Sequence, residues 1–148
     1  MSQVISLRLP DDTAQRLKES AKRAGRSVHE VGIRSIEEWL RQNEFAEIEF
    51  RAFYGGRRLA CLRGALPVWE LVMIAQDHDM DTERIAAYFK WPVWRVQAAL
   101  NYYAAYPEEI DEVIESNRSM TAEKLQRLLP ELEVYEVPSS TSTDEPKP

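Results

Sequence analysis

The residues best suited to chemistry form a short run near the middle of the chain. Asp77, His78, Asp79 and Asp81 combine three carboxylates with an imidazole, which are common ligands of divalent metal ions. A short mixed run of this kind is more typical of the solvated end of a helix, and no second histidine or cysteine group accompanies it. The pattern therefore predicts no metal site.

The remaining candidates for catalysis stand alone. Cys61 alternates with Leu59, which is typical of a core cysteine rather than a nucleophile. His29 falls in the first turn of a helix, where we expect it to be exposed. The Gly55-Gly56 pair lacks the spacing of a phosphate-binding loop. We therefore expect no catalytic residue and no cofactor, and we do not expect an enzyme.

The composition is that of a soluble globular protein. The 148 residues are 44% hydrophobic and 30% charged, which suits one ordinary domain or two very small ones. The single cysteine excludes an intramolecular disulfide. No run approaches the ~20 apolar residues of a membrane helix. Charged residues stand where a signal peptide needs its apolar core. We expect a cytoplasmic protein with no membrane partner.

The net charge of −6 is unevenly distributed along the chain. Residues 1–45 carry eight basic and seven acidic side chains, and residues 46–106 carry seven of each. Residues 107–148 carry four basic and eleven acidic side chains, so the excess of acid lies in the C-terminal third. This asymmetry indicates a protein with two different ends, of which the acidic one suits a basic partner.

Residues 1–45 predict one strand and two helices. Apolar side chains alternate in the segment QVISLRL, which is the period of a half-buried strand. A helix capped by Asp11 or Asp12 and ending at Gly25 follows, and the S-x-x-E pattern at Ser27 predicts a capping box for the second helix. The strand has no partner within its unit, so we expect an obligate dimer in which two copies of the strand pair antiparallel.

The second helix of this unit carries an apolar stripe. Gly32 lies inside the stripe, and because glycine is costly within a helix, its presence there indicates the close approach of another helix. The stripe consists of Val28, Gly32, Ile36, Trp39 and Leu40.

The order of these elements resembles the ribbon-helix-helix family of repressors and antitoxins. The resemblance rests on a strand ending in LRLP, an acidic-capped helix, a Gly-Arg-Ser turn and a second helix. In that family the paired strands enter the major groove of DNA. The resemblance implies that outward side chains of the strand contact bases and that the start of the second helix holds a phosphate. These residues are Val4, Ser6 and Arg8 for the bases, and the backbone amides of Arg26, Ser27 and Val28 for the phosphate. The alternative is that they are surface residues of a dimerisation module.

Residues 46–117 predict a β-hairpin followed by helices. The hairpin spans Ile48 to Arg63, with Gly55-Gly56 in a tight primed turn. A short helix, a three-residue break and a longer helix follow, which is the layout of a helix-turn-helix. The helices are expected from Pro67, from Asp81 or Thr82 through Phe89, from Val93 after the break Lys90-Trp91-Pro92, and from Pro107 to Asn117.

The strings LRGALPVWEL and ALNYYAAYPEEID in this unit resemble a small helix-turn-helix domain that occurs in antitoxins paired with PIN-like toxins. If the unit bound DNA, the residues facing the groove would be Trp94, Arg95, Gln97, Ala98 and Asn101. The unit is neutral and its final helix is acidic, so we favour a packing or oligomerisation role. The aromatic group is expected in the core or, where exposed, in a protein interface. That group is Trp91, Trp94, Tyr102, Tyr103 and Tyr106.

Residues 118–138 predict an amphipathic helix, capped by Thr121 and ended by Pro130, and then an extended acidic strip. In antitoxins of the resembled family the C-terminal part usually covers the toxin. The resemblance thus implies toxin contacts from Leu125, Leu128, Leu129, Leu132, Glu133, Val134 and Glu136. The alternative for the helix is packing on its own helix-turn-helix unit. Residues 139–148 contain no apolar residue and predict a disordered tail.

Together these patterns predict a mainly α protein: a ribbon-helix-helix unit, a small helix-turn-helix bundle with a β-hairpin, and an acidic C-terminal tail. The function we expect is that of a type II antitoxin. It would be a homodimer or higher oligomer that binds operator DNA, represses its own operon and neutralises a PIN-like ribonuclease toxin. The alternatives are a free-standing dimeric transcriptional regulator without a toxin partner, and an interaction scaffold that dimerises without DNA.

Overall fold

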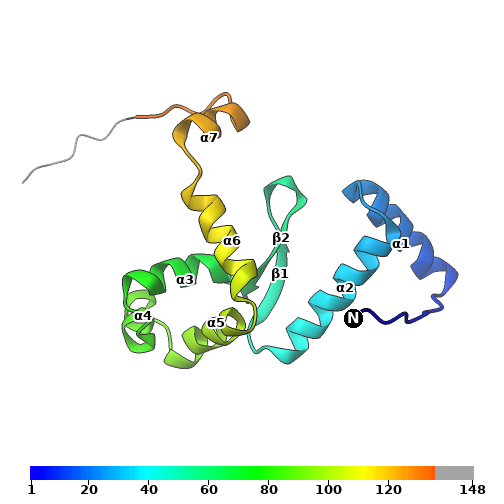
Figure 1. Cartoon of the computed structure of the whole chain (residues 1–148), viewed down its shortest axis with the longest axis horizontal. Helices are drawn as coiled ribbons and strands as arrows, with labels where there is room; N and C mark the ends of the chain where they lie inside the picture. Colours follow the sequence, from blue (N-terminus) through cyan, green and yellow to red (C-terminus); the bar gives the residue numbers. More distant parts are fainter. Residues whose placement is uncertain (136–148) are drawn as a thin grey trace, which may run out of the picture. The chain divides into compact units, whose positions relative to one another are not determined.

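The computed structural model describes residues 1–135, and it confirms the mainly α class with one small antiparallel sheet (Figure 1). The chain divides after Ile114 into two compact units. The predicted tail 139–148 and Glu136 lie outside the described residues. The elements are α1 (Asp11–Ala24), α2 (Val28–Glu44), β1 (Ile48–Ala52), the 3-10 turn η1 (Tyr54–Gly56), β2 (Arg58–Leu62), α3 (Val68–Asp77), α4 (Thr82–Phe89), α5 (Val93–Ala105), α6 (Pro107–Arg118) and α7 (Ala122–Leu128).

The ends of α1 follow partly from the predicted signals. Pro10 is the residue before the first turn, and Asp11 and Asp12 lie inside that turn, so the predicted aspartate cap is wrong. Their charges still stabilise the positive end of the helix dipole. At the other end Gly25 adopts φ 62°, and its amide donates to the carbonyls of Ala21 and Lys22, which confirms the predicted glycine stop.

The predicted capping box begins α2. The hydroxyl of Ser27 accepts a hydrogen bond from the Glu30 amide at 3.1 Å, and the Glu30 carboxylate accepts one from the Ser27 amide at 2.9 Å. Both bonds satisfy amides that the first turn of a helix leaves without partners. The start of α2 is therefore fixed by two side chains of its own chain.

Residues 1–10 carry no strand in the single chain. A strand is defined by its hydrogen-bonded neighbour, and the prediction placed that neighbour in a second copy of the protein. Within residues 1–45, all of which the structure describes, only Ala21 is buried. The first two helices therefore contribute almost nothing to a core within one chain.

The β1–β2 hairpin forms as predicted, in a register that pairs Ile48 with Leu62 and Ala52 with Arg58. Its turn is longer than the expected two-residue turn, because the Phe53 amide donates to the Arg57 carbonyl at 2.8 Å across three intervening residues. Gly55 and Gly56 both have positive φ, at 78° and 74°. The glycine pair therefore supplies the backbone freedom that a tight turn needs, in a turn of a different type.

The core of the first unit lies in residues 48–114. It combines one side of the hairpin with inward faces of α3, α4, α5 and the start of α6. Figure 1 shows these helices gathered beside the base of the hairpin. The largest fully buried side chains are Tyr102, Ile48, Leu62, Leu71, Ile85, Val68, Val72, Val96 and Cys61.

The predicted short helix, break and longer helix are present as α4, residues 90–92 and α5. Asp81 caps α4 by accepting from the Glu83 and Arg84 amides at 3.0 and 3.1 Å. Lys90 ends α4 in the left-handed region, with φ 56°. Pro67 precedes α3 rather than occupying its first position.

The second unit contains α7 among its described residues. Its predicted cap is confirmed, since Thr121 accepts from the Lys124 amide at 3.2 Å. No residue of α7 is buried. Residues 131–135 form no strand in the single chain, so the extended strip expected there is not part of a sheet.

Candidate nucleic-acid and partner interfaces

The predicted base-reading residues lie on an exposed N-terminal segment. All of residues 1–10 are exposed, with Val4 at 96% and Leu7 at 65% of their full accessible surface. Arg8 forms no ion pair within the described part of the chain. The single chain thus leaves both sides of the segment open. Separating a base-reading side from a core side requires the second strand.

A second exposed surface follows α2, which we call the α2 apolar face: Val28, Gly32, Ile36, Trp39 and Leu40. Its four large side chains are all exposed, Trp39 at 63%. No atom lies within 4 Å of the position that a Cβ at Gly32 would occupy, so the predicted close approach is not made within this chain. Exposed apolar side chains gathered on one side of a helix are typical of protein interfaces, so this face is a candidate interface.

The start of α2 places its three predicted phosphate-binding amides unequally. The Arg26 amide donates to the Ala21 carbonyl at 3.0 Å, and the Ser27 amide donates to the Glu30 carboxylate. Neither of these bonds uses the Val28 amide, which lies at the first residue of α2. The backbone hydrogen bond from Ser27, followed by that from its side chain, lowers the pKa of Glu30. The first turn therefore holds a carboxylate of its own.

The predicted groove-facing residues of α5 do not form one surface. Arg95 donates to the Arg63 carbonyl at 2.8 Å, and its guanidinium lies 4.6 Å from the centre of the Trp91 ring. Ala98 is 7% exposed. Gln97 and Asn101 hydrogen-bond to each other at 2.9 Å, and Trp94 is 60% exposed. Arg95 and Ala98 thus serve packing, which favours the structural alternative for α5.

The aromatic group is divided between core and surface. Tyr102 is fully buried, whereas Trp94 is exposed. Trp91, Tyr103 and Tyr106 are half-buried against the core. Most of the group therefore belongs to the core, as expected, and Trp94 remains available to a protein partner.

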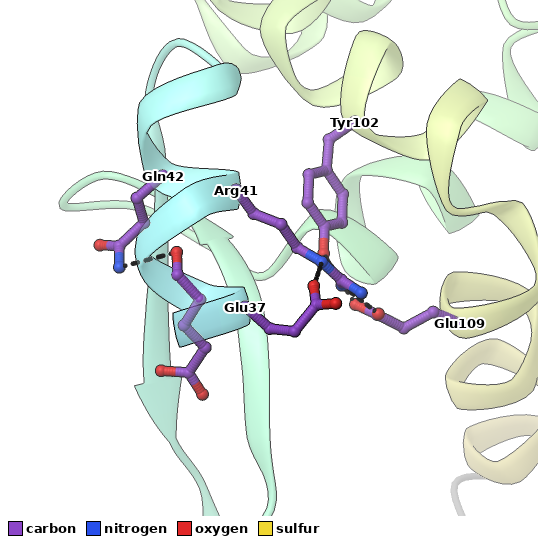
Figure 2. A network of polar contacts seen from close by, with 6 residues as sticks. Glu37, Arg41, Gln42, Tyr102 and Glu109 are labelled. Atoms are coloured by element: carbon purple, nitrogen blue, oxygen red, sulfur yellow. Dashed lines mark hydrogen bonds and ion pairs between the residues drawn. The ribbon is translucent and has the colours of Figure 1, made fainter. Parts of the chain in front are cut away.

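Sequence reasoning missed a polar joint between α2 and the core (Figure 2). Arg41 on α2 donates to the Tyr102 hydroxyl at 2.9 Å and to the Glu109 carboxylate at 2.6 Å. The Tyr102 hydroxyl in turn donates to the other Glu109 oxygen at 2.9 Å. The Arg41 guanidinium also lies 3.9 Å from the centre of the Tyr106 ring, and it pairs with Glu37 at 3.2 Å. We call Arg41, Tyr102 and Glu109 the Arg41 joint.

The electrostatics of the Arg41 joint favour a charged arginine and a neutral tyrosine. Burial disfavours the charge of Arg41, but the hydrogen bonds to Glu109 and Tyr102 outweigh it and raise the pKa of the guanidinium. Burial, followed by the charge of Glu109, raises the pKa of Tyr102. No local sequence signal identifies this contact, because its partners lie 61 and 68 positions after Arg41.

The predicted toxin-contacting residues of the second unit are solvent-accessible. Leu128, Leu129, Leu132 and Val134 are exposed and Leu125 is half-buried. The Glu133 carboxylate accepts a hydrogen bond from the Tyr135 hydroxyl. The described part of this unit therefore presents its apolar side chains without a core of its own.

The acidic run has structural roles in the described chain. Asp81 caps α4, Asp79 pairs with Arg84 at 3.3 Å, and the His78 ring lies 5.2 Å from that of Tyr88. No group of three possible metal ligands occurs within residues 1–135. Burial raises the pKa of the Cys61 thiol, which disfavours the reactive thiolate.

Among the described helices, none has the length and apolar character needed to cross a membrane. No family model, curated protein or solved structure matches the chain, so the resemblances drawn from short motifs stay predictions.

Proposed function

We propose that the chain is a type II antitoxin of the cytoplasm that binds operator DNA as a dimer, represses its own operon and neutralises a PIN-like ribonuclease. The observation that carries the proposal is the exposure of apolar side chains at both ends of a chain whose core lies between them. Each end needs a partner, and the two ends differ in charge and pattern, so they take different partners.

The first partner is a second copy of the chain. The alternating segment before α1 needs a strand to pair with, and the α2 apolar face needs apolar cover. Burying one Leu, Ile or Val side chain contributes about 1.5–3 kcal/mol. A dimer that pairs two N-terminal segments and covers both α2 faces satisfies both needs, and it is the arrangement that the resemblance to the ribbon-helix-helix family implies.

In that dimer the paired strands are the DNA-reading element. Ile5, Leu7 and Leu9 face the core of the dimer. The alternating residues Val4, Ser6 and Arg8 then lie on the outer side. An arginine can donate two hydrogen bonds to a guanine edge, and a valine can contact a thymine methyl group. The Val28 amide and the Arg26 side chain can contact the DNA backbone beside the strands.

The second partner is the toxin. The strip after Pro130 combines apolar Leu132 and Val134 with acidic Glu131 and Glu133, which suits a basic nuclease surface. Apolar burial would hold the complex, while charges at the rim would speed association and select the partner.

Truncation after Asn117 tests the proposal. We expect the shortened chain to keep DNA binding and to lose protection of cells that co-express the nuclease encoded beside it. The control is Trp94→Ala in the full chain, which removes the exposed aromatic ring of α5 and should leave protection intact. Full protection by residues 1–117 would contradict the assignment of toxin binding to the C-terminal unit. Absence of any neighbouring nuclease would favour the free-standing regulator.

A further inference from the structure

A groove of about 480 Å³ lies between α2 and the β1–β2 hairpin. Charged side chains dominate its walls. The basic ones are Arg26, His29, Arg34, Arg41, Arg57 and Arg58, and the acidic ones are Glu30, Glu37, Glu38 and Glu109.

Five of these ten side chains are already paired with one another. Glu37 and Glu109 hold Arg41, and Glu38 accepts from Arg58 at 2.7 Å. Arg26 and Arg34 form no ion pair within the described residues and act on Glu30 only through space.

Arg57 has only a weak partner. Its guanidinium lies 3.8 Å from Glu112, whose side chain is 76% exposed, and an ion pair of that kind contributes little. The arginines that line the groove thus outnumber its glutamates by one, five to four. Three of them, Arg26, Arg34 and Arg57, have no carboxylate of the described chain within hydrogen-bond distance, so their guanidinium groups are available to an anion.

These available guanidinium groups lie beside the predicted DNA-contacting start of α2. A second groove, of about 420 Å³, is also lined by Arg26 and Arg34, and its other wall includes Gly55 and Gly56 at the tip of the hairpin. The hairpin tip is therefore close to the turn that leads into α2. Figure 1 shows the hairpin and α2 side by side.

The groove and the α2 apolar face use different sides of one helix. At about 100° per residue, Arg34, Glu37 and Arg41 lie on one side of α2, and the apolar face from Val28 to Leu40 is centred well away from them. A second copy that covers the apolar face thus leaves the groove open.

We propose that the α2–hairpin groove binds the phosphate backbone of duplex DNA outside the segment read by the paired strands. Its ligand is a phosphodiester of either strand, held by Arg34 and Arg57, with Arg26 beside them. Guanidinium groups match phosphate oxygens with two parallel hydrogen bonds, so three in one groove suit a polyanion. The contact adds affinity and fixes position without reading sequence. This site rests on the proposed DNA binding of the N-terminal unit.

The test measures the salt dependence of DNA binding by the full chain. The probes are the duplex that the wild-type chain enriches from a random pool, and a scrambled duplex of equal length. The variant is Arg34→Gln with Arg57→Gln. The control is Arg84→Gln, which removes an arginine on α4 outside the groove whose side chain is 64% exposed, against 46% for Arg57. The logarithm of the binding constant falls with the logarithm of salt by about 0.9 for each phosphate that the protein neutralises.

We expect the double variant to flatten that slope by about 0.9 for each phosphate that it no longer binds, and to weaken the binding of both duplexes by the same factor. Lysine at both positions should restore most of the slope, because it keeps the charge. A double variant with the slope and affinity of Arg84→Gln would overturn the groove proposal alone. If the double variant keeps its DNA binding but loses binding to poly-L-glutamate, the groove proposal is wrong and the ligand of the groove is an acidic protein.

The proposed function fails by a different result. If the pool yields no preferred duplex but a duplex of arbitrary sequence binds with a slope that depends on Arg34 and Arg57, strand reading is wrong and the groove proposal stands. If the wild-type chain binds no duplex, both are wrong. Unfolding curves of all variants show whether a loss of binding reflects a loss of structure.

Discussion

Replacing Arg41 with methionine is expected to lower the free energy of unfolding by about 2–3 kcal/mol. The Arg41 side chain is only 19% exposed, and it donates to both Tyr102 and Glu109. A hydrogen bond to a charged group contributes about 1.5–3 kcal/mol when buried. Glu109 is 36% exposed, so solvent screening reduces its share to about 1 kcal/mol.

Two further effects modify this magnitude. The interaction with the Tyr106 ring adds about 0.5–1 kcal/mol, and methionine retains part of the packing of the arginine stem. Tyr102 is not left unsatisfied in the variant, because its hydroxyl still donates to Glu109. The expected loss therefore stays below that of a fully buried ion pair.

Urea unfolding followed by tryptophan fluorescence, at one fixed protomer concentration, measures the loss. The control is Arg16→Met, which removes a highly exposed ion pair with Asp12 and should change stability by less than about 0.5 kcal/mol. A double-mutant cycle with Glu109→Gln isolates the coupling between the two charges. Equal losses for Arg41→Met and Arg16→Met, with no coupling to Glu109, would refute the Arg41 joint.

Three more predictions concern the Arg41 joint and residues 1–45. Because the pKa of Tyr102 is raised in the folded chain, the hydroxyl loses its proton at a lower pH in the unfolded chain than in the folded one. The difference in unfolding free energy between wild type and Tyr102→Phe should therefore be constant below about pH 10. Above about pH 10 it should fall by about 1.4 kcal/mol per pH unit. Urea unfolding at pH 8 and pH 11 measures this change, and a pH-independent difference would contradict it. Leu7→Lys should dissociate the dimer, which sedimentation at micromolar concentration would show; a dimeric variant, or a folded wild-type monomer, would refute strand pairing. Arg8→Ala should weaken binding to the preferred duplex by about 1–3 kcal/mol and relax sequence preference while the dimer persists; unchanged selectivity at the same salt would exclude the strand as the reading element.

Local signals in the sequence predicted most helix ends. The pattern from Ser27 to Glu30 and the aspartate at position 81 work through bonds that span two or three residues, so neighbours along the chain suffice to identify them. Asp11 failed as a cap because Pro10 already occupies that position with extended backbone. The presence of each helix was therefore predictable from the sequence. The identity of a capping residue was less so, because one neighbouring residue can change it, as Pro10 does for α1.

Contacts between distant segments were not predictable in this way. Nothing near Arg41 indicates that it meets Tyr102, and nothing near Arg57 indicates that the hairpin tip lies beside α2. Ala98 and Arg95 were placed on a possible DNA-facing surface by helical spacing, but the direction of that face depends on how α5 packs against α3 and the hairpin. The strand expected before α1 needs a hydrogen-bonded neighbour from a second chain, so it does not form in the single chain.

The Arg41 joint links a segment that is made early to groups that are made later. Residues 1–45 leave the ribosome before residues 46–114, yet α1 and α2 bury only Ala21 among themselves. One anchor of α2, the bond from Arg58 to Glu38, lies 20 residues further along the chain, but Tyr102 and Glu109 lie 61 and 68 residues after Arg41. Domains generally fold from the N-terminus as they emerge. Here α2 is made early, and its attachment to the core is complete only when Glu109 has been made.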